Sequence, residues 1–261
     1  MIGRKNAVWE NELGQRVEID NKFLFLESID MTGTSGIHTV ESLAGADGQI
    51  TVSSKLAPKT IPCTIALNNR RRDEYMSEYL SQVFSPLTKG RLIVYTKTQR
   101  YEIECRPQDF PVFQRDKVSY VWRFDVDFAA DYPLWKKGGM RDIAVGDIDM
   151  SGYNRILKSH CPFEIAPDIY FPATNENVIF QLYPRGSTSK QISLMPHNFP
   201  VLINTLEFKI INADDGSDQS QLIDATTELD SIRIRYGENI VVASPNDRVR
   251  IQYYELSNGE I

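Results

Sequence analysis

The sequence has little of what reactive and metal-binding sites are built from. Its 261 residues include only three cysteines, which are odd in number and far apart: Cys63, Cys105 and Cys161. This pattern argues against a disulfide framework and a Cys-x-x-Cys metal site. The three histidines form no compact ligand pair of the kind that zinc sites use: His38, His160 and His197. We therefore expect no bound metal and no cofactor.

Long apolar runs and a basic excess are also missing. No apolar run approaches the roughly 18 residues of a membrane span. Residues 1–20 contain no stretch long enough for a signal-peptide core, so we expect synthesis and retention in the cytoplasm. The net charge of −6 divides into +1 for residues 1–137 and −7 for residues 138–261. Neither half has the basic excess of a nucleic-acid binder, so we expect neither nucleic acid nor a membrane as a partner.

Catalytic motifs are absent as well. The sequence has no Gly-x-Ser-x-Gly, Gly-x-Gly-x-x-Gly or Gly-Lys-Ser/Thr segment, so hydrolase, dinucleotide and phosphate sites have no motif to support them. The acidic segment 214–218 lacks the ligand register of a helix-loop-helix calcium site and predicts an ordinary turn. Asp147 and Asp149 have the spacing of two residues on one strand face, but no second feature supports catalysis. We predict a non-enzymatic protein with no catalytic residues.

The first half shows the alternation of β-strands. In residues 118–128, every even position is apolar and most odd positions are polar, and only an extended strand places alternate side chains on one face. Residues 61–67 alternate in the same way. Residues 91–95 and 100–105 read as a hairpin joined by the polar segment 96–99.

One segment of this half predicts a helix instead. Apolar residues between positions 75 and 84 form a stripe on a single helix face. Asn69 suits the N-cap and Pro86 ends the helix. Three arginines precede it: Arg70, Arg71 and Arg72. They form either a solvated turn, as charge runs usually do, or a contact with acidic groups of a neighbouring subunit.

The second half reads as a separate β domain. We place the boundary at Gly138-Gly139, where paired glycines loosen the backbone and the charge changes. Beyond it, short apolar runs alternate with turn residues, and the expected strands are 178–183, 205–211, 231–236, 240–243 and 249–254. The predicted fold is mainly β, with a first domain (1–137) that carries one amphipathic helix and a sandwich or jelly roll over 138–261.

The order of these elements resembles the phage distal tail family, also called phage tail components, which form the baseplate hub of long-tailed phages. The long strand of the first half runs into Asp131, Pro133 and Trp135, which is similar to the family's Asp-Pro-aromatic-Trp ending. Near the end of the chain, Gly237, Glu238 and Asn239 resemble the turn of the family's closing strand pair. We take these six residues as structural motifs.

The resemblance implies a structural subunit of a phage or prophage tail tip, with no catalytic residues. In this family, the first domains form a hexameric hub ring that joins the tail tube to the baseplate and tip proteins. The second domain is a galectin-like sandwich that projects outward. The implied partners are copies of the chain itself, the tail tube protein, a tail-tip (tail-associated) protein and a receptor-binding protein. The chain would be made in the bacterial cytoplasm and assembled in the virion tail tip.

A second function stays open beside the structural one. A β-sandwich can bind a sugar through an exposed flat aromatic side chain, and the second half offers several tyrosines and phenylalanines. The alternative is therefore an adhesion module that recognises a saccharide of the host cell wall. A cell-wall hydrolase is disfavoured, because the sequence contains no acid, base or metal constellation.

Overall fold

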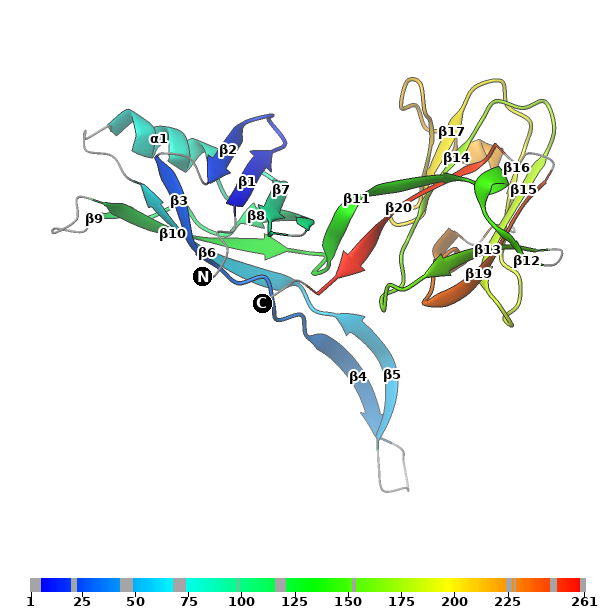
Figure 1. The fold of residues 1–261 in the computed structure, drawn as a ribbon, viewed down its shortest axis with the longest axis horizontal. Coiled ribbons are helices and arrows are strands. Elements are labelled where there is room, and N and C mark those ends of the chain that lie inside the picture. The colour runs from blue at the N-terminus through cyan, green and yellow to red at the C-terminus, as the bar shows by residue number, and fades with distance from the viewer. Residues whose placement is uncertain are drawn as a thin grey trace. The chain divides into compact units, whose positions relative to one another are not determined.

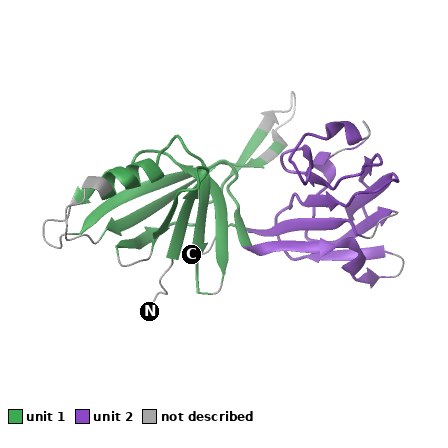
Figure 2. Cartoon of the chain, turned by 90° about the horizontal axis from the view of Figure 1, so that it is seen from above, with its two compact units in different colours: residues 1–137, 257–261 green, residues 138–256 purple. Residues whose placement is uncertain are grey.

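In the computed structural model of this chain, the described residues are 6–19, 23–42, 49–67, 74–97, 99–115, 121–151, 154–223, 227, 229–244 and 248–258. They form twenty β-strands, three short 3-10 helices and one α-helix, which lies in the first half. The prediction of a mainly β protein with one helix is confirmed. The chain divides into two compact units, residues 1–137 with 257–261 and residues 138–256, and each is described by itself (Figure 2).

Apart from a separate two-stranded hairpin, unit 1 contains two groups of antiparallel strands that belong to one continuous sheet (Figure 1). The strands of the first, in spatial order, are β2 (Arg16–Ile19), β1 (Asn6–Asn11), β7 (Gly90–Tyr95) and β8 (Arg100–Pro107). Those of the second are β3 (Leu24–Ile29), β6 (Lys59–Leu67), β10 (Trp122–Ala130) and the short β9 (Gln114–Arg115). Because β8 pairs with both β7 and β10, the two groups are joined at this strand.

The predicted alternation accounts for the core of unit 1. In β10, Phe124, Val126 and Phe128 are buried, while the intervening aspartates are exposed. The paired strand β6 buries Ile61, Cys63 and Ile65 on the same pattern. The predicted 91–95 and 100–105 hairpin is also confirmed, with the amide of Thr96 donating to the carbonyl of Gln99.

The helix α1 (Glu74–Val83) covers this core with its apolar face. Leu80, Val83 and the following Phe84 are fully buried. The indole N–H of Trp9 donates to the carbonyl oxygen of Val83 at 2.9 Å, which satisfies one of the free carbonyls at the helix end. The predicted helix is confirmed, while its proposed N-cap, Asn69, lies outside the described residues.

Unit 2 contains two further antiparallel sheets. The strands of one are β18 (Lys209–Asn212), β17 (Val201–Asn204), β14 (Asp168–Phe171), β20 (Arg250–Ser257) and β11 (Trp135–Ala144), which begins in unit 1. Those of the other are β12 (Met150–Ser151), β13 (Asn154–Ser159), β19 (Gly237–Ser244), β15 (Val178–Pro184) and β16 (Gln191–Leu194). Phe171 of the first meets Phe180 of the second edge to face at 6.0 Å, so the sheets pack as a sandwich. The 3-10 helices are η1 (Val145–Asp147), η2 (Ser220–Leu222) and η3 (Leu229–Ser231).

One predicted strand of unit 2 is wrong, and another is wrong in its first half. Residues 205–211 are the turn after β17 followed by β18, because the Asn204 side chain accepts the N–H groups of Leu206 (3.0 Å) and Glu207 (2.6 Å) and closes the turn. Residues 231–236 begin in η3 and make only one isolated bridge, from Ile234 to Ile165. The strands predicted at 178–183, 240–243 and 249–254 correspond to β15, β19 and β20.

The paired glycines do not form a loose joint. Gly138 and Gly139 lie inside strand β11, and Gly138 has φ of +73°, a conformation that favours glycine. The glycine is needed there for the path of the strand. The division into units nevertheless falls directly after Lys137.

Candidate functional site

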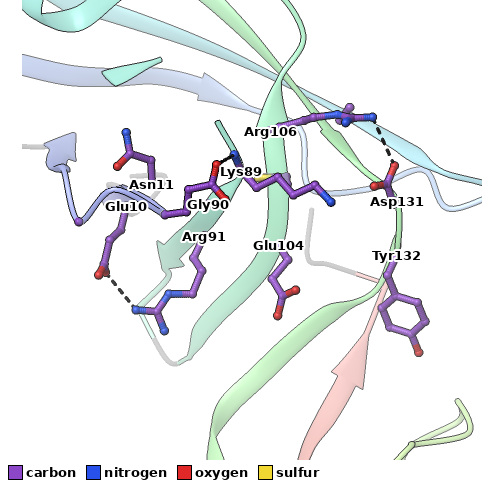
Figure 3. A pocket seen from close by; sticks show the side chains of 13 residues that line it. Glu10, Asn11, Lys89, Gly90, Arg91, Glu104, Arg106, Asp131 and Tyr132 are labelled. Carbon is purple, nitrogen blue, oxygen red and sulfur yellow. Dashed lines mark hydrogen bonds and ion pairs between the residues drawn. The ribbon is translucent and has the colours of Figure 1, made fainter. Parts of the chain in front are cut away.

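A cleft of about 520 Å³ opens on unit 1 where several strand ends meet (Figure 3). Its walls come from the end of β1 and the turn after it, the start of β7, the second half of β8 and the end of β10. Acidic and basic side chains alternate around it: Glu10, Glu12, Glu104 and Asp131 with Lys89, Arg91 and Arg106. The cleft therefore presents a mixed charge.

Ion pairs across neighbouring strands fix most of these side chains. Arg91 contacts Glu10 at 3.1 Å and the buried Glu102 at 3.6 Å. Arg106 lies 3.9 Å from Asp131. Because both partners are partly exposed in the Arg91–Glu10 and Arg106–Asp131 pairs, each of these two pairs contributes at most about 1 kcal/mol. They orient the rim of the cleft more than they stabilise the fold.

A glycine allows two strands to approach closely beside the cleft. Asn11 of β1 pairs with Gly90 of β7. A Cβ atom at Gly90 would lie 2.3 Å from the carbonyl oxygen of Glu10 and 2.7 Å from the Trp9 ring. These distances are far below contact, so only glycine lets β1 and β7 approach here.

The described residues that line the cleft include one thiol, and it is poorly reactive. This cysteine, Cys105, is buried, and this burial raises the pKa of the thiol well above its usual range. A thiol in that state is not a reactive thiolate at neutral pH. Among the residues that the structure describes, neither histidine nor serine lines the cleft.

The candidate motif at the end of β10 has a structural role. Trp135 is fully buried and its indole N–H donates to the carbonyl oxygen of Met31 at 3.0 Å. Pro133 is buried and its carbonyl accepts the Thr34 hydroxyl at 3.4 Å. Asp131 is exposed at the cleft. Pro133 and Trp135 thus tie the chain after β10 to the segment that follows β3, whereas Asp131 pairs with Arg106 of β8.

The second motif also builds the fold, but its local structure differs from the prediction. Gly237, Glu238 and Asn239 begin strand β19 and are not the centre of a turn. Asn239 is fully buried, donating to the carbonyl of Arg235 at 2.8 Å and accepting its N–H at 2.9 Å. Glu238 pairs with Arg185 at 2.6 Å, and this hydrogen bond lowers the pKa of the carboxyl group. Asn239 therefore closes the bend that leads into β19.

The third candidate site cannot be placed in space. Arg70, Arg71 and Arg72 lie outside the described residues, so their suggested contact with a neighbouring subunit stays a prediction.

The acidic segments behave as ordinary surface. Asp215 accepts the backbone N–H and the hydroxyl of Ser217, and Asp218 accepts the same two groups of Ser220. These hydrogen bonds lower the pKa of both carboxyl groups and confirm the predicted turn. Asp147 lies in η1 and Asp149 after it, so the two do not share a strand face. Within the described ranges, no group of three or more His, Cys, Asp or Glu is placed to hold a metal ion.

A long hairpin is the feature that the sequence reading missed. Strands β4 (Gly36–Ser42) and β5 (Gln49–Leu56) pair only with each other among the described strands. They stand apart from the other strands of unit 1 (Figure 1). Ile37 and Leu56 are 42% and 38% exposed. Residues 43–48, between the two strands, lie outside the described residues.

Such a hairpin is unusual as a free element. Two-stranded sheets are only marginally stable in water, and their open edges invite pairing with another chain. The Ala57 amide donates to the Ser35 carbonyl at 2.8 Å and closes the base of the hairpin. The open edges and exposed apolar side chains of the hairpin suit contact with another protein.

No helix in the described part of the chain is long and apolar enough to cross a membrane.

Comparison with known proteins agrees with the resemblance noted in the sequence. Residues 13–130 match the family described as the phage tail protein RIFT-related domain. This match includes the hairpin and most of the cleft. No curated protein sequence matches the chain.

Solved phage structures share the fold over nearly the whole chain. The Dit protein (gp 19.1) of phage SPP1, described as a paradigm of the hub adsorption apparatus in phages that infect Gram-positive bacteria, superposes with a TM-score of 0.71 at 13% identity. That alignment covers 96% of this chain and 99% of the Dit chain. A chain of the phage P2 baseplate in its activated, calcium-containing conformation gives 0.60 at 9% identity, with 98% and 99% covered. The predicted resemblance to phage distal tail proteins is thus confirmed.

Proposed function

We propose that this chain is a structural subunit of a phage or prophage tail tip. Six copies form a hub ring that joins the tail tube to the baseplate and tip proteins. The observation that carries this proposal is the agreement in fold with a phage hub protein along almost the entire length of both chains. A phage tail domain over residues 13–130 supports it independently.

The hairpin supplies a physical reason for assembly. Strands β4 and β5 expose apolar side chains and have open edges. Packing against a neighbouring copy would bury these side chains and cover these edges. In a closed ring, each copy gives its hairpin to one neighbour and receives one from the other. This is the heterologous type of contact that cyclic assemblies use.

The two units divide the work in this proposal. Unit 1, whose charge is nearly balanced, forms the ring, because copies with little net charge approach without long-range repulsion. Unit 2 is the galectin-like peripheral domain that meets other tail-tip proteins, including a receptor-binding protein. The chain works through its surfaces and carries out no catalysis.

Shortening the hairpin tests the ring. In the variant, the two residues Asn-Gly replace residues 36–56, so that a tight turn links Ser35 to Ala57. Sedimentation velocity of the full chain over a range of concentrations should give hexamers, and the shortened chain should remain monomeric. Its thermal melting should change little, because the hairpin pairs with no other described strand.

A milder variant guards against misfolding. Ile37→Asp places a charge on the hairpin and should weaken assembly, while Ile179→Asp, at a position equally exposed on β15, should not. Monomeric full chain at every concentration, even with the tail-tip partner added, contradicts the proposal. Hexamers that persist without the hairpin contradict its role in the ring.

A further inference from the structure

We infer that Lys59 is a clasp that holds residues 257–258, where the chain returns from unit 2, onto unit 1. The chain passes between the two units twice, after residue 137 and again after residue 256. The inference concerns the second of these passages. It goes beyond the structural role of the chain and depends on neither ring assembly nor a tail-tip partner.

The clasp residue lies at the start of strand β6 and is buried. Lys59 is 3% exposed, although lysines are rarely buried unless their ammonium group is paired. This group contacts the carbonyl oxygen of Met31, and its nitrogen lies 3.5 Å from the carbonyl oxygen of Asn258. The nitrogen also lies 5.9 Å from the centre of the Trp135 ring. One side chain therefore meets three segments, which are the one after β3, the start of β11 and the end of β20.

Two of these segments are the passages between the units. Trp135 lies just before the first passage, and Asn258 lies just after the second. The Lys59 ammonium group lies close to both, so both segments are attached to the same point of unit 1.

The first passage is also held by contacts that do not involve Lys59. Trp135 is fully buried, and the two residues after it pair with strand β8. Lys136 forms an ion pair with Glu104 of that strand at 2.6 Å. Loss of the Lys59 ammonium group would therefore leave the first passage in place.

The second passage depends more on the clasp. Asn258 is exposed, and the 3.5 Å between its carbonyl oxygen and the Lys59 nitrogen is long for a hydrogen bond. Two residues earlier, the carbonyl oxygen of Leu256 accepts the thiol of Cys161 at 3.3 Å, within unit 2. The end of β20 is thus bound in unit 2 at one residue and by Lys59 in unit 1 shortly after it. With the clasp closed, both passages are fixed to unit 1, and with it open, only the first is.

Backbone ¹⁵N relaxation of the full chain tests the clasp. In the wild type, the amides of Ser257 and Asn258 should have the order parameters of a rigid backbone, about 0.85. In Lys59→Met, both values should fall below about 0.6, while those of Trp135 and Lys136 should stay near the rigid value. A lysine that only stabilised the core would change the free energy of unfolding and leave the mobility of residues 257–258 in the native state unchanged.

Two further variants make the outcome unambiguous. Lys136→Met removes a lysine at the first passage and leaves the clasp intact, so the order parameters of Ser257 and Asn258 should equal those of the wild type. Lys59→Gln replaces the clasp by a shorter, uncharged and polar side chain, and it should show the same loss of order as Lys59→Met. Mobile amides at residues 257–258 in the wild type overturn the inference, whether or not the variants fold. Equal order in the wild type and in either Lys59 variant overturns it as well.

Discussion

Lys59 and Trp135 donate to the same acceptor, the carbonyl oxygen of Met31. The indole N–H of Trp135 lies 3.0 Å from this oxygen, and the Lys59 ammonium group contacts it directly. The ammonium nitrogen also lies 5.9 Å from the centre of the Trp135 ring. Lys59 is 3% exposed and Met31 is 1% exposed. A buried lysine thus joins the start of β6 to the start of β11, where the chain leaves unit 1.

A shared acceptor predicts that the two donors are coupled. In Lys59→Met, the Met31 carbonyl keeps the indole N–H, and in Trp135→Phe it keeps the ammonium group. The double variant leaves it buried without a donor, so it should lose about 1–2 kcal/mol more than the two single losses added together. Urea unfolding of the four proteins measures this coupling. If the loss of unfolding free energy in the double variant equals the sum of the two single losses to within about 0.5 kcal/mol, the two donors are not coupled through the Met31 carbonyl.

Burial of Lys59 also predicts a pH dependence. Desolvation lowers the pKa of its ammonium group from the ordinary value of 10.5, and the carboxylate of Asp30 opposes this only in part. Between the lowered pKa and 10.5, the unfolded chain binds a proton that the folded chain does not. The contribution of Lys59 to stability therefore rises as pH increases through this window.

Wild type and Lys59→Met should be compared by urea unfolding from about pH 7 to about pH 10. The stability of the wild type relative to the variant should increase with pH, since all other titrating groups are common to both. Lys97→Met, at an exposed position of the same unit, should show no such trend. A difference that stays constant or falls with pH would contradict the direction of the shift.

Gly90 should tolerate no side chain. In Gly90→Ala, the new Cβ would meet the backbone of Glu10 and Asn11, so β1 and β7 would have to separate. We expect a loss of about 1–3 kcal/mol in the free energy of unfolding. Gly139→Ala is the matched control, because nothing lies within 4 Å of its Cβ position. Equal stability of the two variants in thermal melting would refute the close approach.

The thiols should be unreactive in the folded protein. All three cysteines are buried and free, and burial raises the pKa of Cys63 to about 12. A thiol-specific disulfide reagent near neutral pH should therefore react slowly with the native chain and rapidly with all three thiols in denaturant. Fast reaction of one thiol in the native state would show that the corresponding strand opens.

Sequence patterns anticipated the regular parts of unit 1 and missed what long-range contacts create. The alternation along β6 and β10 and the stripe of α1 each arise from one face packing on one core, so they are visible locally. Lys59 continues the buried positions 61, 63 and 65, a signal that could have identified it as a buried lysine. The short strands β14, β16 and β17, with four residues each, are too short to show a period.

For the candidate sites too, the sequence identified some residues but not the long-range contacts that they make. Trp135 and Asn239 were singled out by resemblance, and their buried hydrogen bonds explain why such residues matter to the fold. The sequence did not predict the projecting hairpin, because its lack of pairing with the other described strands is visible only in three dimensions.

The most direct test of the ring is electron microscopy of the purified full chain, alone and mixed with its tail-tip partner. The account predicts closed rings with six-fold symmetry in the class averages of at least the mixture, and their loss when residues 36–56 are replaced by a short turn. Particles without rotational symmetry at every concentration, with and without the partner, would contradict it.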